Sequence, residues 1–250
     1  TDAALMSKFH VTYGRQDKPR TTWFHATDCD VQDAGAKNVA ITCTSAVGFG
    51  TGHTWRVQVR NVQTGILEGF AQSSVTTGYA TPRISNIALE NSGAAATALD
   101  TRGGTRLTLN GTNFGPLGLL LEGFYTSDPG RGWYCAVNCS VIVADTTATC
   151  LTAPGIGAQM MWKFEKIDHD WRGIPILTAE ATTAYAKPVI SDVANCENCS
   201  TEGRGRVEFS THGGEDVFVT GNGFGPIPNP SDTCAPADSG AILVSYSNEI

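Results

Sequence analysis

One stretch of the sequence occurs twice, and this duplication constrains the fold more than any other feature. Residues 101–116 read TRGGTRLTLNGTNFGP, and residues 210–226 read STHGGEDVFVTGNGFGP. The paired glycines, the third glycine and the Phe-Gly-Pro ending of the first stretch all return 110 residues later. A pattern that returns at a fixed period is typical of a repeat architecture. We therefore interpret the chain as consecutive copies of one module.

Each copy of the stretch predicts a half-buried strand followed by a bend. Leu107 and Leu109 alternate with polar residues, and Val217 and Val219 hold the same positions in the second copy. Alternation with a period of two indicates a strand with one buried face. The glycine-rich bend carries one large apolar residue, Phe114 in the first copy, which we interpret as a plug over the open end of a sandwich. A phosphate-binding loop is excluded, because neither a Lys-Ser/Thr pair nor a helical pattern follows the glycines.

Further matches run through the chain at offsets of 106 to 110 residues. They pair Cys29 with Cys139, Cys43 with Cys150, Trp55 with Trp162, and Pro82 with Pro188. A repeat of this length is the size of an immunoglobulin-like sandwich. We predict an all-β fold of tandem sandwiches, in which 82–187 is a complete domain, 1–81 is the C-terminal part of a first and 188–250 the N-terminal part of a third. The chain would then be a piece of a longer array, and the short Tyr-Ala-x-Pro joints favour a semi-rigid rod.

Apolar alternation also gives the expected strands. In the first copy these are 5–13, 39–44, 54–62 and 66–76; in the second 83–89, 105–110, 119–125, 139–144, 147–151, 160–167 and 176–185; in the third 189–193, 206–210, 216–220 and 241–246. On the strand 54–62 we expect Trp55 to face inward and Arg56 to face outward.

Composition limits the classes of partner. The net charge of −7, without any run of Lys and Arg, excludes a nucleic-acid backbone as a partner. No apolar run approaches the roughly 20 residues of a membrane span. No motif for a cofactor or a serine nucleophile is found, and the cysteines do not form the close sets of four that a zinc site needs, so we predict a protein that is not an enzyme and has no cofactor.

The cysteines point to an oxidising compartment. Eight are present, which is many for a cytosolic chain of this composition. Because they occupy equivalent places in the repeat, we predict the disulfides Cys29–Cys43 and Cys139–Cys150. For the C-x-x-C pair Cys196 and Cys199 we prefer a local disulfide over a redox motif, because no strand-to-helix setting follows. Two cysteines remain, Cys135 and Cys234. They would pair with each other across copies, or one of them would pair with a cysteine outside residues 1–250.

Three Asn-x-Ser/Thr sequons agree with this compartment and predict N-linked glycans at Asn110, Asn138 and Asn198. Asn110 is the preferred acceptor, since strand parity directs its side chain to solvent.

Other residues that could take part in binding or catalysis do not recur between copies. We expect surface or loop positions for the histidines, which are His10, His25, His53, His169 and His212. The sequence Asp168-His169-Asp170 could hold a divalent ion or act as acid and base, but in one copy alone. Trp23, Trp133 and Trp171 would contact sugar or protein if exposed, and we prefer core positions for them.

A known family shares these features. The pattern P-x-I-S-x-I, then GGT-x-L-T-L-x-G-T-N-F-G, a cysteine pair and T-A-P-G-I-G resembles the IPT/TIG domains of plexins, scatter-factor-type receptors and long cell-surface arrays. The resemblance covers the whole chain as one complete and two partial copies, and Gly213-Gly214 and Gly221-Asn-Gly-Phe-Gly225 carry it independently. It implies an early-set immunoglobulin sandwich that serves as a spacer, adhesion or assembly module. The DNA-binding branch of the family is disfavoured by the acidity and the cysteines.

We therefore expect a structural protein, secreted or at the cell surface, whose sandwiches build a rod or fibre with other copies or fibre subunits as partners. An extracellular filament or flagellar hair, at a flagellar or ciliary surface, fits this description. Two alternatives stay open. A ligand-binding receptor ectodomain would need a membrane span and a cytoplasmic domain after the array. A carbohydrate-binding accessory region of a secreted enzyme would need a catalytic domain and a planar row of exposed aromatic residues.

Overall fold

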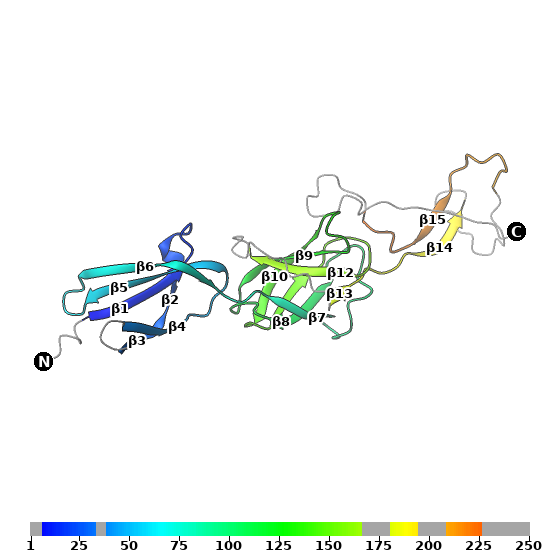
Figure 1. Cartoon of the computed structure of the whole chain (residues 1–250). Helices are drawn as coiled ribbons and strands as arrows, with labels where there is room; N and C mark the ends of the chain where they lie inside the picture. Colours follow the sequence, from blue (N-terminus) through cyan, green and yellow to red (C-terminus); the bar gives the residue numbers. More distant parts are fainter. Residues whose placement is uncertain (1–6, 34–38, 167–180, 195–208, 227–250) are drawn as a thin grey trace.

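The computed structural model describes residues 7–33, 39–166, 181–194 and 209–226. Its strands fall into three groups that follow one another along the molecule: an N-terminal group β1–β6, a middle group β7–β13 and a C-terminal hairpin β14–β15 (Figure 1). All pairings between these strands are antiparallel. Within the described residues the only helix is the short 3-10 helix η2 (Arg20–Thr22). The prediction of an all-β sandwich fold is confirmed.

The N-terminal group has six strands in two sheets. They are β1 (Ser7–Gly14), β2 (Phe24–His25), β3 (Thr27–Asp33), β4 (Val39–Thr44), β5 (Thr51–Asn61) and β6 (Leu67–Gly78). One sheet has the order β2-β1-β5-β6, and the other is the hairpin β3–β4.

The middle group is one continuous seven-stranded sheet. Its strands are β7 (Arg83–Leu89), β8 (Arg106–Thr112), β9 (Leu120–Thr126), β10 (Tyr134–Val143), β11 (Thr147–Leu151), β12 (Met160–Lys166) and β13 (Thr182–Thr183), in the order β13-β12-β9-β10-β11-β8-β7.

This sheet folds over at β10 into two layers. The pairing of β10 with β9 shifts register between Ala136 and Cys139, and such a bulge bends the strand. As a result Phe114, which follows β8, packs edge-to-face on Phe164 of β12 with ring centroids 5.3 Å apart, although β8 and β12 are not neighbours in the sheet. A backbone hydrogen bond of 2.9 Å from Leu99 to Ala184 ties the two layers together near β13.

The space between the layers is the core. Leu107, Leu109 and Phe114 are completely buried there, as the alternation and the plug predict, together with Trp162 from the opposite layer. Gly111 makes the plug feasible: a Cβ on Gly111 would overlap the carbonyl oxygen of Arg83 and lie 2.7 Å from the Phe114 ring. Only glycine therefore permits the ring to fold back at this point.

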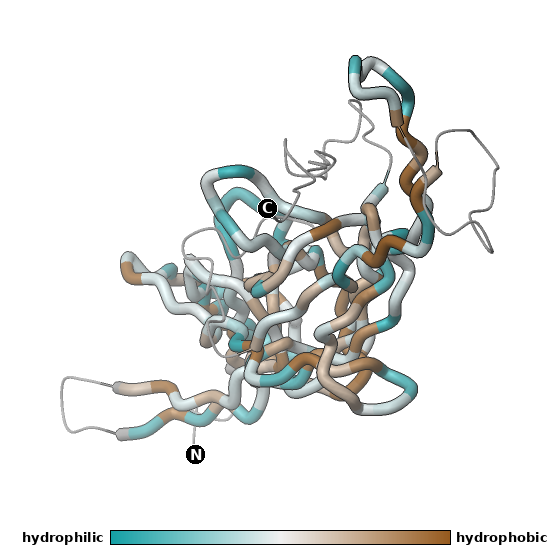
Figure 2. Tube along the Cα trace, turned by 90° about the vertical axis from the view of Figure 1, so that its right-hand side faces the viewer, coloured by the Kyte–Doolittle hydropathy of each residue, from teal (hydrophilic) through white to brown (hydrophobic). Residues whose placement is uncertain are grey.

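The C-terminal hairpin pairs β14 (Val189–Ala194) with β15 (Phe218–Asn222). Its register reproduces that of β7 and β8: Ile190 lies opposite Gly221 as Ile84 lies opposite Gly111, and a register shift follows in both cases. Figure 2 views the molecule from the C-terminal side and shows hydrophobic residues along this hairpin, which projects toward the viewer.

Several predicted strand boundaries are wrong. β10 begins at Tyr134 instead of 139, β15 covers Phe218–Asn222 instead of 216–220, and β13 is reduced to two residues, with 176–180 outside the described residues. Phe209 and Ser210 are not in a strand, and the remainder of 206–210 and all of 241–246 lie outside the described residues. β2 and β3 were not expected, because the polar sequence of β3, TDCDVQD, has low strand propensity.

The expectation that Arg56 faces solvent is also wrong. Arg56 does lie on the opposite face of β5 from Trp55, but only 8% of it is exposed. The ring of Phe70 on the neighbouring strand β6 covers its guanidinium at 4.3 Å. Cation–π stacking thus replaces hydration on this face of β5.

Candidate functional site

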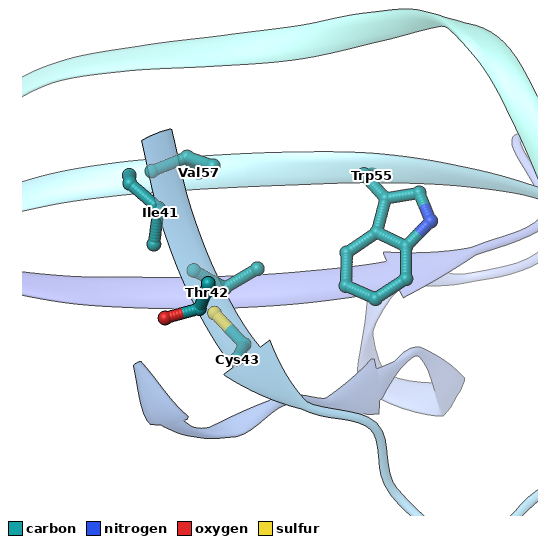
Figure 3. A pocket seen from close by; sticks show the side chains of 6 residues that line it. Ile41, Thr42, Cys43, Trp55 and Val57 are labelled. Carbon is teal, nitrogen blue, oxygen red and sulfur yellow. The ribbon is translucent and has the colours of Figure 1, made fainter. Parts of the chain in front are cut away.

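The N-terminal group contains an open apolar groove of about 360 Å³. Figure 3 shows that β4 lies on one side of the groove and that Trp55 and Val57 of β5 line the other. The described residues that line it are Val11, Ile41, Thr42, Cys43, Trp55 and Val57. None of these side chains carries a formal charge, so the groove fits an apolar surface rather than an ion.

The groove is open because β4 has a strand on one edge only. Among the described strands β4 pairs with β3 alone. In the middle group, the strand with the same local pairing, β11, lies between β10 and β8. There Leu109 of β8 lies opposite Ala148, and both are fully buried. No described strand therefore takes the place beside β4 that β8 takes beside β11.

One end of the groove is closed by a hydrogen-bonded aromatic network. Tyr13 stacks on Trp55 at 4.2 Å between ring centroids, and the indole Nε1 of Trp55 donates to Oγ1 of Thr77 at 2.8 Å. The hydroxyls of Tyr13 and Tyr79 are 2.5 Å apart, and Tyr79 donates to the carbonyl of Ala46 at 2.6 Å. Burial, followed by the hydrogen bond with Tyr13, raises the pKa of Tyr79. The Tyr79 phenol therefore stays protonated and serves as a hydrogen-bond donor to Ala46.

The same network occurs in the middle group. Tyr125 stacks on Trp162 at 4.3 Å, its hydroxyl lies 2.6 Å from that of Tyr185, and Tyr185 donates to the carbonyl of Ala153 at 2.7 Å. Trp162 Nε1 donates to Thr183 Oγ1 at 3.0 Å. Burial raises the pKa of Tyr125 to about 12, and it raises that of Tyr185 as well. Each tyrosine and tryptophan of one network has a counterpart in the other.

Neighbouring groups meet through the glycine-rich bends. A Cβ on Gly115 would lie 3.9 Å from Cβ of Phe49 in the N-terminal group. Asn113 of the same bend donates from Nδ2 to the carbonyl of Thr81 at 3.0 Å. At the next joint a Cβ on Gly225 would lie 2.6 Å from Ile156 of the middle group. Gly115 and its counterpart Gly225 thus both lie beside the preceding group.

Comparison with protein families and with curated sequences gives no match. No protein-family model matches this chain, and no curated protein sequence matches it. The function must therefore be inferred from the contacts of the chain itself.

The structure contains the two disulfides that the repeat predicts. Cys29 is joined to Cys43 across β3 and β4, and Cys139 to Cys150 across β10 and β11, with Cα–Cα distances of 4.1 and 4.2 Å. Gly123 of β9 packs on the second of these bonds, since a Cβ there would lie 2.7 Å from the sulfur of Cys139.

The other cysteines are described only in part. Cys135 also takes part in a disulfide. Cys196, Cys199 and Cys234 lie outside the described residues, so the local Cys196–Cys199 bond stays a prediction.

The sequons differ in accessibility. Asn110 is half-buried on β8, between β7 and β11, and its Oδ1 accepts a hydrogen bond of 3.3 Å from Thr147. Asn138 is exposed at the bulge of β10 with a φ of 53°. Asn198 lies outside the described residues. The geometry favours Asn138 over the expected Asn110, because an acceptor side chain must project from the surface.

The histidines follow the surface expectation except at one position. His10 and His25 are exposed with Nε2 and Nδ1 3.1 Å apart, and His212 is exposed. His53 is only 4% exposed on β5, and its Nε2 lies 3.0 Å from the carbonyl of Phe49. Its burial corrects the surface assignment and places it beneath the loop that reaches the next group. His169, with the rest of Asp168-His169-Asp170, lies outside the described residues.

The tryptophans outside the repeated strand divide between core and surface. Trp23 is buried, which agrees with the preference for a core position. Trp133 is half-buried, and the ammonium of Lys163 lies 4.4 Å from its ring and 5.1 Å from that of Phe124. Trp171 lies outside the described residues.

Neither a metal cluster nor a membrane-spanning helix is found in the described part of the chain. No group of three or more His, Cys, Asp or Glu side chains is placed to hold a metal ion there. No helix in that part is long and apolar enough to cross a membrane.

Proposed function

We propose that this chain is a structural and assembly module of an extracellular repeat protein, in which tandem immunoglobulin-like sandwiches of IPT/TIG type build a rod or fibre. The observation that carries the proposal is the joint between neighbouring groups. The glycine bend of one group lies beside Phe49 of the preceding group at the first joint and against Ile156 at the second. A joint that is built twice from equivalent residues gives successive modules one repeated orientation, as a rod requires.

The repeat interpretation is supported by registers and hydrogen bonds that recur. Tyr13 lies opposite Trp55 on β1 and β5, as Tyr125 lies opposite Trp162 on β9 and β12. The hairpins β7–β8 and β14–β15 share a register and the hydrogen bond from a serine on the first strand to a carbonyl on the second. The N-terminal group thus has the contacts of the second half of a module, and the C-terminal hairpin has those of the first half.

The extracellular setting is supported by the disulfides. Bonds such as Cys29–Cys43 and Cys139–Cys150 persist in oxidising compartments and are rare in the cytosol. Both close short loops, of 14 and 11 residues, within a single group. Each module is therefore stabilised independently of its neighbours, which suits a protein that bears load outside the cell.

Small-angle X-ray scattering of the 250-residue chain tests the rod. A single compact body of this length would have a radius of gyration of about 18 Å, and modules in a row give a larger value with a scattering profile typical of a cylinder. The variant Phe49→Ser removes the ring that packs on Phe24 beside the first joint, and it is expected to broaden the distribution of interatomic distances. The matched control is Val47→Ser in the same loop, where the side chain is exposed. A radius near the compact value, or equal profiles for both variants, would contradict the proposal.

A further inference from the structure

We infer that His10 and His25 form a binding site for one divalent transition-metal ion, Cu²⁺ or Zn²⁺, on the outer face of the N-terminal group, and that Gln58 orients His10 within it. These three side chains come from the described strands β2, β1 and β5, and we call them the histidine site. The inference does not depend on the proposed rod.

Strand pairing brings the two imidazoles together. β2 pairs with β1 so that His25 lies opposite Thr12, and His10, two residues before Thr12, lies on the same face of the sheet. Both histidines are exposed. Their ring centroids are 5.1 Å apart, and Nε2 of His10 lies 3.1 Å from Nδ1 of His25. Two imidazole nitrogens therefore meet on the surface of two paired strands.

The separation of these nitrogens is that of two ligands of one metal ion. A histidine nitrogen binds zinc at about 2.0–2.1 Å. At that distance two nitrogens are roughly 3.3 Å apart in tetrahedral geometry and roughly 2.9 Å apart in square-planar geometry, which copper prefers. The 3.1 Å between His10 and His25 lies between these values. Because both rings are exposed, they can turn to direct their lone pairs at one ion without movement of the strands.

Gln58 determines which nitrogen of His10 is free to bind. It lies opposite His10 in the pairing of β1 with β5, and its Oε1 is 3.3 Å from Nδ1 of His10. An amide oxygen only accepts hydrogen bonds, so Nδ1 of the neutral ring carries the proton and Nε2 has the lone pair. Histidines that bind metals donate their second N–H to an acceptor in the same way.

The proton between the two rings can leave without a change in charge. Since Nε2 of His10 is the acceptor, Nδ1–H of His25 is the donor of the hydrogen bond that joins the rings. When an ion binds, this proton passes from Nδ1 to water, and Nε2 of the same ring takes up a proton from water. Both imidazoles are neutral before and after the exchange, as metal ligation requires.

The site belongs to the N-terminal group alone. The registers of β1–β2 and β9–β10 place Glu122 and Cys135 at the positions of His10 and His25. Cys135 takes part in a disulfide, so the middle group has no equivalent pair. His10 lies on the opposite face of β1 from the buried Val11. The β8 layer of the middle group packs on the counterpart of that buried face, so a second layer there leaves the histidine site open.

The two nitrogen ligands select the class of metal. Imidazole suits Cu²⁺ and Zn²⁺, whereas Mg²⁺ and Ca²⁺ prefer oxygen ligands. A given set of nitrogen ligands binds Cu²⁺ more tightly than Zn²⁺. Two protein ligands leave the other coordination positions to water, so the bound ion is accessible from solvent.

Isothermal titration calorimetry of the oxidised 250-residue chain tests the site with CuCl₂, ZnCl₂ and MgCl₂. We expect one Cu²⁺ or Zn²⁺ to bind per chain, Cu²⁺ more tightly, and Mg²⁺ to give no binding heat. His10→Ala and His25→Ala should each weaken Zn²⁺ binding by roughly tenfold or more. The matched control is His212→Ala, which removes another exposed histidine and should leave the affinity unchanged.

Two variants of Gln58 test its role in orienting His10. Gln58→Ala keeps both ligands but removes the acceptor for Nδ1–H, so the affinity for Zn²⁺ should fall by roughly tenfold. Gln58→Glu keeps an acceptor and adds a negative charge, so it should bind Zn²⁺ more tightly than the unmodified chain. Imidazole ¹⁵N chemical shifts identify the ligating atoms, which should be Nε2 of His10 and Nδ1 of His25.

Either of two results would overturn the inference. One is the absence of saturable Cu²⁺ and Zn²⁺ binding by a chain whose circular dichroism is that of a folded β protein. The other is equal affinity in His10→Ala and the unmodified chain; loss of binding in His169→Ala would then assign the ion to Asp168-His169-Asp170. The scattering test of the rod is run with a chelator present, so its result is independent of the histidine site.

Discussion

Replacement of the plug residue, Phe114→Ala, is the perturbation that the middle group should tolerate least. The Phe114 side chain is completely buried, packs edge-to-face on Phe164 at 5.3 Å, and holds the β8 layer against the β12 layer. Gly111 lies directly against the Phe114 ring and the backbone of Arg83, so truncation of Phe114 leaves an empty space beside the paired strands β7 and β8. The cavity should therefore persist.

The magnitude follows from this geometry. Truncation of a fully buried Phe to Ala costs about 3–5 kcal/mol, and an edge-to-face aromatic pair contributes about 0.5–1.5 kcal/mol of that loss. We expect the free energy of unfolding of the middle group to fall by about 4 kcal/mol. A change of that size corresponds to a roughly thousandfold change in the population of the open state.

Hydrogen exchange followed by mass spectrometry measures this change locally. Amides of β8 and β11 that open only with the middle group should exchange about a thousandfold faster in Phe114→Ala. The matched control is Phe224→Ala, which alters the same motif where the side chain is only half-buried. That control should leave the exchange of β8 and β11 unchanged. Less than roughly tenfold acceleration in Phe114→Ala, or equal acceleration in the control, would refute the role of the plug.

Three further predictions concern the disulfide of the middle group, the buried Tyr125 and the N-linked glycans. Replacing both Cys139 and Cys150 by Ala should lower the free energy of unfolding of the middle group by about 3 kcal/mol, from the 11-residue loop that the disulfide closes, as measured by urea denaturation. Since burial raises the pKa of Tyr125 from 10.0 to about 12, its proton is bound more tightly in the folded state. Its contribution to stability should be complete below pH 10 and lost as the pH rises through 12; tyrosinate absorbance rising well below pH 12 without unfolding would contradict this. In glycopeptides of secreted material, occupancy should be higher at the exposed Asn138 than at Asn110, and the reverse order would show that strand burial does not limit modification.

The sequence predicted those features that depend on strand alternation, on the repeat of about 110 residues and on local pattern. Leu107 and Leu109 were assigned to the core because strand alternation forces both onto one face, and both are fully buried. The disulfide partners followed from equivalent positions in two copies. β11 was predicted with the boundaries that the structure shows, Thr147–Leu151, because apolar residues alternate up to a clear turn.

Features that depend on long-range pairing were not predictable. β3 is acidic and polar, and it forms because it pairs with β4 and is bonded to it through Cys29–Cys43. Arg56 and His53 are buried because β6 and a loop lie over them, and nothing in their own sequence neighbourhood signals that cover. The groove was not expected either. It lies at the edge of β4 that pairs with no described strand. Pairing between strands distant in sequence leaves no local pattern from which such an open edge could be predicted.

The aromatic networks and the joints are coupled through one short loop in each module. Tyr79 donates to the carbonyl of Ala46, and Gly48 lies so close to the same hydroxyl that a Cβ there would be 2.6 Å from it. The next residue, Phe49, is the one that meets Gly115 across the joint. In the middle group the corresponding loop is held by Tyr185 and ends at Ile156, which meets the bend of the C-terminal hairpin. In both groups a tyrosine hydroxyl therefore holds the loop whose last residue lies beside the following glycine bend.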